Sequence, residues 1–224
     1  MEISERLSAI AGTVRYGTMV DIGTDHAYLP IALCKMHKIN SALATDINKS
    51  PILRAKANIE KNGLSEQIKT QLCAGLEGVT PAEYESCVIA GMGGMEIIKI
   101  LRNSLDVAYG FRQLVFSPQR DIRALRIFLY ENDFYISNEI MLKDSGKFYN
   151  ILDCGIGREC AKYTEEEYIF GRYLIENHCK VLAEYIEIEI MKTQHNMEFL
   201  NTKHSRYKEL NQYLYVCKNI LEKL

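Results

Sequence analysis

The chain has no tryptophan, only 4 prolines in 224 residues, and no long apolar run. A membrane-spanning helix needs about 20 mainly apolar residues, so we expect no membrane partner. The hydrophobic content of 47% is too high for a disordered chain. The formal charge of −2 decides little, because local patches rather than the total signal a nucleic-acid partner.

Paired cysteine motifs are also missing. The 7 cysteines are odd in number, form no C-x-x-C motif and have no histidine at ligand spacing. This excludes a regular disulfide framework or a zinc ribbon. The pattern predicts a metal-free protein in the reducing cytoplasm. Residues 1–12 are predicted to form an amphipathic helix with Ile3, Leu7 and Ile10 on one face, rather than a secretion signal.

Glycine and proline are absent after Gly171, which indicates a helical tail. Two helices meeting near residues 201–205 are predicted to form an antiparallel coiled-coil hairpin that packs within the chain, so we expect a monomer. The expected domains are residues 1–160 and 161–224. The predicted stripes are Leu174, Val181, Tyr185, Ile188, His195 and Phe199 on the first helix, and Tyr207, Leu210, Leu214, Cys217, Leu221 and Leu224 on the second.

The stretch Val20–Pro30 organises the rest of the chain. A short apolar strand ends at Gly23, where the backbone can turn freely, and helical periodicity follows at once. Open parallel sheets bind nucleotide-like ligands at such a turn. An ordinary strand-to-helix turn with chance polar residues is the alternative.

Further strands alternate with helical segments, which predicts a parallel sheet with helices on both faces. The last two strands are separated only by residues 143–147, too few for a parallel crossover, so the sheet should end in an antiparallel hairpin. The fold class is therefore α/β, with the seven-stranded sheet of Rossmann-like class I methyltransferases. The expected strands are residues 19–22, 42–47, 68–73, 85–90, 113–116, 135–142 and 148–156.

The first turn does not suit a pyrophosphate. In the G-x-G-x-x-G fingerprint the second and third glycines would stand where this chain has Asp25 and Tyr28. A carboxylate there would repel phosphate but suits a cation such as the sulfonium and ammonium groups of S-adenosylmethionine. Asp46 ends the second strand, where an acid bonds the ribose of a nucleoside; the alternative is a helix-capping aspartate.

The fourth strand ends in Ala90-Gly91-Met92-Gly93-Gly94. Three glycines let a ligand approach bare backbone, whereas a close helix–strand crossing would need only one. The acid or Asn followed by Pro-Pro-aromatic that is usual for methylation of an exocyclic adenine amine is absent. Ring N1 of adenine already carries a lone pair, so its methylation needs positioning more than a base.

Five arginines cluster between residues 102 and 126. Three of them follow the Ser117-Pro118-Gln119 turn, namely Arg120, Arg123 and Arg126. A patch that contacts phosphates and a solvated helix face are both open interpretations.

Three motifs together resemble the bacterial tRNA (adenine-22-N1)-methyltransferase family, TrmK. They are Asp21-Ile22-Gly23-Thr24-Asp25-His26-Ala27-Tyr28-Leu29-Pro30, Ala90-Gly91-Met92-Gly93-Gly94 and Gly146-Lys147-Phe148-Tyr149. Ser4, Arg6 and Leu7 resemble the family's opening helix, and Pro118 its Gln-Pro-Asn turn. The similarity covers about residues 4–155. It implies S-adenosylmethionine-dependent methylation of N1 of an adenine in the D-arm of tRNA.

The resemblance also implies roles for single residues. Those expected to bind the cofactor are Arg6, Asp21, Gly23, Asp25, His26, Tyr28, Asp46, Ile47, Ala74, Gly75, Ala90 and Gly91. Those expected at the reacting centre are Asp25, Gly91, Met92 and Gly93, and those on the tRNA side are Ser117, Pro118, Gln119, Arg120, Arg123 and Arg126.

The chain departs from the family in two places. Cys73-Ala74-Gly75-Leu76 stands where the family has Gly-Asp-Gly-Leu, so the acid that would receive the cofactor's adenine amine is absent. Ser117-Pro118-Gln119 replaces Gln-Pro-Asn. Two other functions therefore stay open: a cofactor-binding adaptor that acts through its coiled coil, and an NAD-dependent oxidoreductase.

Overall fold

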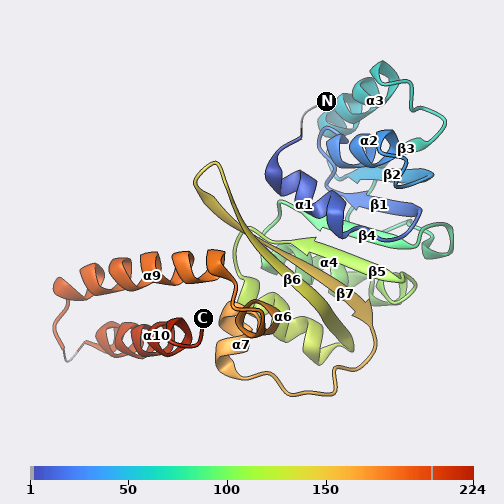
Figure 1. The fold of residues 1–224 in the computed structure, drawn as a ribbon. Coiled ribbons are helices and arrows are strands. Elements are labelled where there is room, and N and C mark those ends of the chain that lie inside the picture. Colours follow the sequence, from blue (N-terminus) through green and yellow to red (C-terminus); the bar gives the residue numbers. More distant parts are fainter. Residues whose placement is uncertain (1–2, 203) are drawn as a thin grey trace.

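One seven-stranded sheet forms the centre of the computed structural model, which describes residues 3–202 and 204–224 (Figure 1). The strand order is β3-β2-β1-β4-β5-β7-β6. The first five strands along the chain pair in parallel, and β7 runs antiparallel to β5 and β6, which confirms the predicted sheet. The strands are β1 (Thr18–Ile22), β2 (Ser41–Asp46), β3 (Ile68–Leu72), β4 (Ser86–Ala90), β5 (Gln113–Ser117), β6 (Phe134–Asp144) and β7 (Lys147–Ile156).

Helices cover both faces of the sheet, as parallel crossovers require. One face packs against Ile10, Leu33 and Ile59 of α1 to α3, and the other packs against Leu101 and Leu125 of α4 and α6. In the part of the chain that is described, no helix is both long and apolar enough to cross a membrane. These helices are α1 (Glu5–Thr13), α2 (Tyr28–Lys35), α3 (Lys49–Lys61), α4 (Gly94–Asn103), α5 (Leu105–Ala108) and α6 (Ile122–Glu131), with a 3-10 turn η1 (Pro81–Glu83) before β4.

The first helix begins later than predicted. Ser4 is its N-cap and accepts a hydrogen bond from the Leu7 amide at 3.2 Å, while residues 1 and 2 lie outside the described chain. The Arg6 amide donates to Asp144 at 3.1 Å. This bond ties the start of α1 to the β6–β7 hairpin and brings the Arg6 side chain to the functional edge of the sheet.

The β6–β7 connection is tighter than expected. Lys143 pairs with Phe148 and Asp144 with Lys147, so only Ser145 and Gly146 form the turn. Their φ angles of 51° and 78° are both positive, as in the two-residue turns that suit twisted hairpins. The prediction of a five-residue connection was wrong because the polar residues Lys143, Asp144 and Lys147 continue the ladder.

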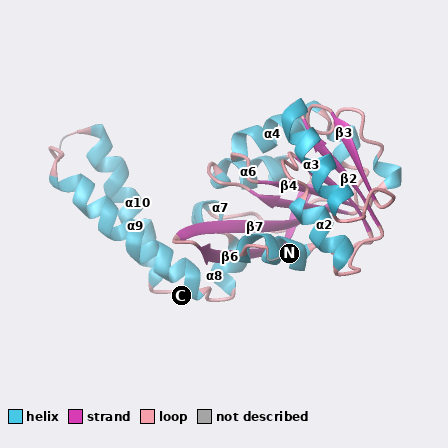
Figure 2. Cartoon of the chain, turned by 90° about the horizontal axis from the view of Figure 1, so that it is seen from above, coloured by secondary structure: helices cyan, strands magenta, loops and turns pink. Residues whose placement is uncertain are grey.

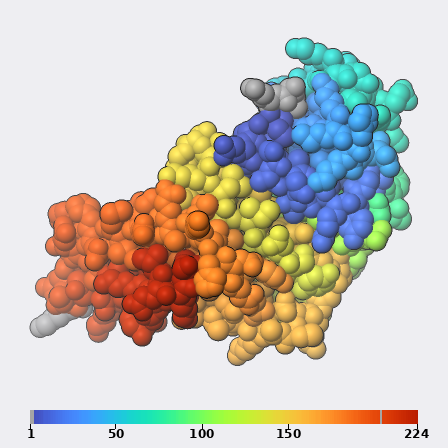
Figure 3. All heavy atoms as spheres, in the orientation of Figure 1, coloured from blue at the N-terminus to red at the C-terminus, as the bar shows by residue number. Residues whose placement is uncertain are grey.

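The C-terminal region forms the predicted helical hairpin. Figures 1 and 2 show α9 and α10 side by side and projecting away from the sheet, and in Figure 3 they form a lobe beside the sheet domain. Two short helices that the sequence did not reveal join the hairpin to the sheet. The four helices are α7 (Glu165–Phe170), α8 (Arg172–Glu176), α9 (Lys180–Glu198) and α10 (Ser205–Leu221).

The predicted stripes of this hairpin are only partly correct. Phe199 is 76% exposed and His195 is also exposed, so neither belongs to the seam. Cys217 is buried as predicted, but its buried neighbours are Leu182, Ile186 and Ile220. The hairpin therefore buries its apolar residues mainly at its base, where it meets the sheet domain.

Candidate active site

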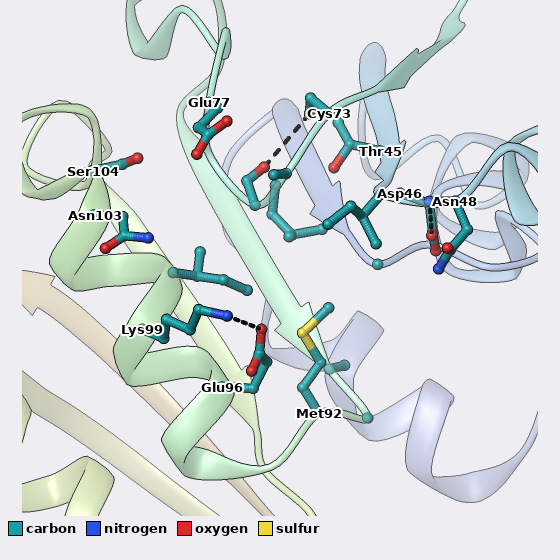
Figure 4. Close-up of a pocket in the computed structure, with 18 residues that line it drawn as sticks. Thr45, Asp46, Asn48, Cys73, Glu77, Met92, Glu96, Lys99, Asn103 and Ser104 are labelled. Atoms are coloured by element: carbon teal, nitrogen blue, oxygen red, sulfur yellow. Dashed lines mark hydrogen bonds and ion pairs between the residues drawn. The ribbon is translucent and has the colours of Figure 1, made fainter.

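A cavity of about 380 Å³ lies at the carboxyl ends of β1, β2, β3 and β4 (Figure 4). This volume is in the range of small-molecule and cofactor sites. Its walls include eight of the residues predicted to bind the cofactor or to lie at the reacting centre: Gly23, Asp46, Ile47, Ala74, Gly75, Ala90, Gly91 and Met92. The other predicted residues, Arg6, Asp21, Asp25, His26, Tyr28 and Gly93, do not line it.

Gly23 makes the turn after β1 that the sequence predicted. Its φ is +72°, and its amide donates to the Thr45 carbonyl at 2.9 Å. A Cβ atom on Gly23 would stand 2.2 Å from the terminal methyl group of Met92. A side chain at this position would therefore collide with the opposite wall of the cavity.

Asp21 lies under this turn instead of facing the cavity. Its carboxylate is buried and accepts a hydrogen bond from the Thr24 hydroxyl at 2.5 Å. Burial raises the pKa of Asp21 to about 6, and the nearby Asp46 carboxylate acts in the same direction. The geometry fits a residue that shapes the turn; direct contact with the cofactor stays a prediction.

Asp25, His26 and Tyr28 form a polar rim beside the turn. Asp25 contacts Arg54 of α3 at 2.5 Å and His26 at 3.5 Å, and the His26 and Tyr28 rings stack at 5.0 Å. Arg54 was missed because nothing in the sequence links it to a residue 29 positions away. It shields the negative charge that we expected Asp25 to offer a cation.

Asp46 ends β2 with a carboxylate that reaches the cavity. One of its oxygens accepts a hydrogen bond from the Asn48 amide at 2.9 Å. Ile47 beside it is 66% exposed and presents an apolar surface to the same space. Since a carboxylate can accept several hydrogen bonds, Asp46 retains capacity for two ribose hydroxyls.

Asp46→Ala should weaken the binding of S-adenosylhomocysteine by about 1–3 kcal/mol, the scale of a lost charge-assisted hydrogen bond. Titration calorimetry measures this directly. Glu60→Ala, on the exposed surface of α3, is the control and should bind normally. Unchanged affinity of Asp46→Ala would remove Asp46 from the ribose site.

The turn after β4 is joined to the turn after β5. The Gly91 amide donates to the Ser117 carbonyl at 3.0 Å, and the Gln119 amide donates to the Met92 carbonyl at 2.9 Å. A Cβ on Gly94 would lie 2.4 Å from the Asp121 carbonyl oxygen. These contacts place the predicted tRNA-side turn beside the floor formed by residues 91–93, but Ser117 and Pro118 are buried, so their assignment to tRNA was wrong and only Gln119 of this turn is exposed.

Arg6 contacts this floor but does not line the cavity. Its Nη2 atom lies 3.3 Å from the position of a Cβ on Gly91, and its Nε donates to the Ser117 hydroxyl at 3.3 Å. The guanidinium also lies over the ring of Tyr149, 4.9 Å from its centroid. Burial lowers the pKa of Arg6, with Tyr149 and Asp144 acting in the opposite direction.

The predicted arginine patch does not form as one surface. Arg126 is 1% exposed and pairs with Glu139 at 2.7 Å, so its assignment to tRNA was wrong. Arg123 forms two hydrogen bonds with Glu165, at 2.7 and 3.0 Å. Arg120 lies beside Gly93 with its side chain 82% exposed, and its Nε atom is 3.6 Å from the Asp121 carboxylate. Arg120 precedes α6, Arg123 lies on its exposed side, and only Arg126 is buried against β6.

The strand order and this cavity define a class I Rossmann-like methyltransferase. The residues fit the cofactor, because an acid stands at the ribose position and bare backbone at the methyl position. A family model described as TrmK, tRNA (adenine(22)-N(1))-methyltransferase, matches residues 19–219. The chain belongs to this family.

Individual relatives agree with this membership. The chain is 35% identical over 164 residues to the tRNA (adenine(22)-N(1))-methyltransferase of Bacillus subtilis, covering 73% of this chain and 69% of that protein. Streptococcus pneumoniae Sp1610 in complex with S-adenosyl-L-methionine is 31% identical, with a TM-score of 0.90 over 98% of this chain and 100% of the other. M. capricolum TrmK with S-adenosylhomocysteine is 27% identical, with a TM-score of 0.88 over 100% and 99% of the two chains.

Proposed function

We infer that this protein transfers a methyl group from S-adenosylmethionine to N1 of adenine 22 in the D-arm of tRNA. The observation that carries this inference is the cavity between Asp46 and the Gly91-Met92-Gly93 turn, in a chain that the family model matches over residues 19–219. An NAD-dependent oxidoreductase is disfavoured because Asp25 and Tyr28 occupy the places of phosphate-binding glycines.

The chain's own residues position the reactants. S-adenosylmethionine supplies the electrophilic methyl group when bound. Asp46 holds the ribose, and the turn at Gly91 leaves an opening through which the edge of an adenine ring approaches. The ring acquires positive charge at N1, so the site must tolerate a cation as it forms. Asp25 is the proposed carboxylate for this role, although Arg54 shields it.

A D-arm adenine must first leave its stack, at a cost of a few kcal/mol. Tyr28 and Phe116 are the aromatic residues of the chain that could stack on the extruded base. Phe116 is fully buried and is excluded. Tyr28 is 42% exposed at the rim and stays a candidate, already stacked against His26.

The test is methylation of an unmodified tRNA transcript, followed by mapping of the modified base. Incorporation at adenine 22 is expected, and a transcript with guanine at position 22 should accept no methyl group. Binding of S-adenosylmethionine without methylation of any tRNA would instead favour the adaptor. A rise in the thermal unfolding midpoint with NAD, but not with S-adenosylmethionine, would favour the oxidoreductase.

Arg120→Ala should weaken tRNA binding and reduce the slope of log affinity against log salt by about one unit, as expected for one lost phosphate contact. Cofactor affinity should stay the same. Arg112→Ala is the matched control, because Arg112 precedes β5 and pairs with Glu85 at 2.6 Å. An identical salt slope in Arg120→Ala would return this residue to the solvated-surface interpretation.

We propose that the helical hairpin orients tRNA and that the protein acts as a cytoplasmic monomer with the domains 1–160 and 161–224. Tyr163 and Phe170 are buried against the sheet domain and the hairpin base, respectively, so deleting the hairpin together with everything after Thr164 would remove part of the buried core. The better test replaces residues 191–212 with a short Gly-Ser turn, which keeps the buried base that includes Leu182 and Cys217.

Removing this distal half should leave cofactor binding intact and lower kcat/KM for tRNA by about tenfold, equivalent to roughly 1.4 kcal/mol of lost contacts. Calorimetry with S-adenosylhomocysteine checks that the catalytic domain is folded. Full activity of the shortened protein on tRNA would show that the hairpin does not orient the substrate.

A further inference from the structure

The cavity has a second end, away from the reacting centre. In Figure 4, Met92 lies at one end of the cavity, Glu77, Asn103 and Ser104 lie at the other, and Asp46 lies between these ends. Gly91, next to Met92 in the chain, and Ala74, Gly75 and Ile100 also line the cavity. A nucleoside whose ribose is held by Asp46 and whose methyl donor faces Gly91 must place its base toward this far end.

The base end is shaped by a turn that packs on α4. The Glu77 amide donates to the Ala74 carbonyl at 3.1 Å, which closes the turn. A Cβ on Gly75 would lie 2.8 Å from Cγ2 of Ile100, so the backbone of the turn is in close contact with α4. Asn103 follows Ile100 by three residues and lies on the same side of α4.

The polar side chains at the far end of the cavity, where the adenine base would lie, do not come from position 74. Ala74 offers no side-chain acceptor, whereas Glu77 and Asn103 both line the cavity. In Figure 4 these two side chains face each other across its far end. Neither has a hydrogen-bond or ion-pair partner among the described residues. By contrast, Glu96 lines the same cavity but contacts Lys99 at 3.8 Å.

We propose that Glu77 and Asn103 read the adenine of the cofactor. The Glu77 carboxylate accepts a hydrogen bond from the exocyclic amine, and the Asn103 side-chain amide donates to ring N1. The hydrogen-bonding groups match. The adenine edge presents one donor, the 6-amine, beside one acceptor, N1; the Glu77 carboxylate can only accept, and the Asn103 amide can donate. The pair thereby replaces the acid that Ala74 lacks. This inference rests on the proposed cofactor, and not on the identity of the RNA.

The test compares two ligands that differ only at this edge. S-inosylhomocysteine has a carbonyl in place of the 6-amine and carries a proton on N1. Wild-type protein should bind S-adenosylhomocysteine at least about tenfold more tightly than S-inosylhomocysteine, because the second ligand sets its carbonyl against the Glu77 carboxylate. Titration calorimetry gives both constants.

Glu77→Ala should reduce this preference to about threefold or less, and adding Ala74→Asp to that variant should restore it. Asn103→Asp should shift the preference toward S-inosylhomocysteine, because the new carboxylate can accept a hydrogen bond from its N1–H group. Glu96→Ala is the control and should keep the wild-type preference.

An undiminished preference in Glu77→Ala would overturn the proposal, and so would an equal loss in Glu96→Ala. The result is separate from the proposed function: a protein that methylates no tRNA but whose ligand preference follows Glu77 would refute the function and retain this inference.

Discussion

Gly91→Val is expected to abolish methyl transfer in a protein that still folds. Gly91 has a φ of +85°, in the left-handed region that a β-branched residue avoids. A Cβ there would lie 3.3 Å from the Arg6 guanidinium and 3.9 Å from the side-chain nitrogen of Gln119. The two methyl groups of valine would occupy the space through which, under the proposed function, the target base approaches.

The expected loss is at least about a hundredfold in single-turnover methylation at saturating cofactor, the scale of a displacement of about 1 Å between reacting groups. Gly63→Val is the matched control. Gly63 has a similar φ of +69°, but no atom lies within 4 Å of its Cβ position, and it follows α3 away from the cavity. This control carries the backbone strain without blocking the site.

Comparable losses in the two variants would show that strain rather than obstruction is responsible. A near-normal rate for Gly91→Val would mean that the base approaches from elsewhere, and the floor would have to be reassigned. Cofactor affinity, measured by calorimetry for each variant, separates damage to the cavity from damage to the approach of the base.

The sheet could be predicted because its signals are local. Apolar runs of five or six residues separated by helical periods define a parallel sheet, and a connection too short for a crossover defines its antiparallel end. The cavity could be located for the same reason. Gly23 and Gly91 each follow a strand and Asp46 ends one, and parallel strands bring their carboxyl ends to one edge.

Side-chain partners between distant elements were beyond the sequence. Arg123 and Arg126 are three positions apart on α6, yet the first pairs with Glu165 near the surface and the second is buried against Glu139. The sequence alone does not distinguish the exposed arginine from the buried one. Likewise, nothing local shows that Arg54 pairs with Asp25, or that Arg6 lies over Tyr149.

The tail shows a different limit. Heptad spacing in α10 predicted a continuous seam, but Leu210 and Leu214 are only half-buried, and Ile220, outside the predicted set, is buried. This hairpin packs against the sheet domain at its base. The residues near that contact are therefore buried, and those farther along the two helices are not. Periodicity gives the face of a helix but not which part of the face is covered.

Arg126→Ala is expected to destabilise the protein by about 3–5 kcal/mol, because it leaves a buried carboxylate without its partner. The Arg126 and Glu139 side chains are each 1% exposed. Arg126 also donates to the carbonyls of Tyr168 and Ile169, at 3.1 and 2.9 Å, which fixes the end of α7 on the sheet. Gly171 packs directly against this ion pair, since a Cβ there would lie 2.5 Å from the Glu139 carboxylate.

Urea unfolding of the single variant should be compared with that of Arg123→Ala, whose Glu165 pair is half-exposed and worth about 0.2–1 kcal/mol. The double variant Arg126→Met/Glu139→Met should lose less stability than Arg126→Ala, because it removes both charges and refills the space with apolar atoms. Equal stability of Arg126→Ala and Arg123→Ala would show that the buried pair does not hold α7.

If Arg126→Ala is too unstable to purify, the double variant still tests the electrostatic explanation. A loss of about 3–5 kcal/mol in the free energy of unfolding of the double variant, as large as that expected for a lone buried charge, would contradict it.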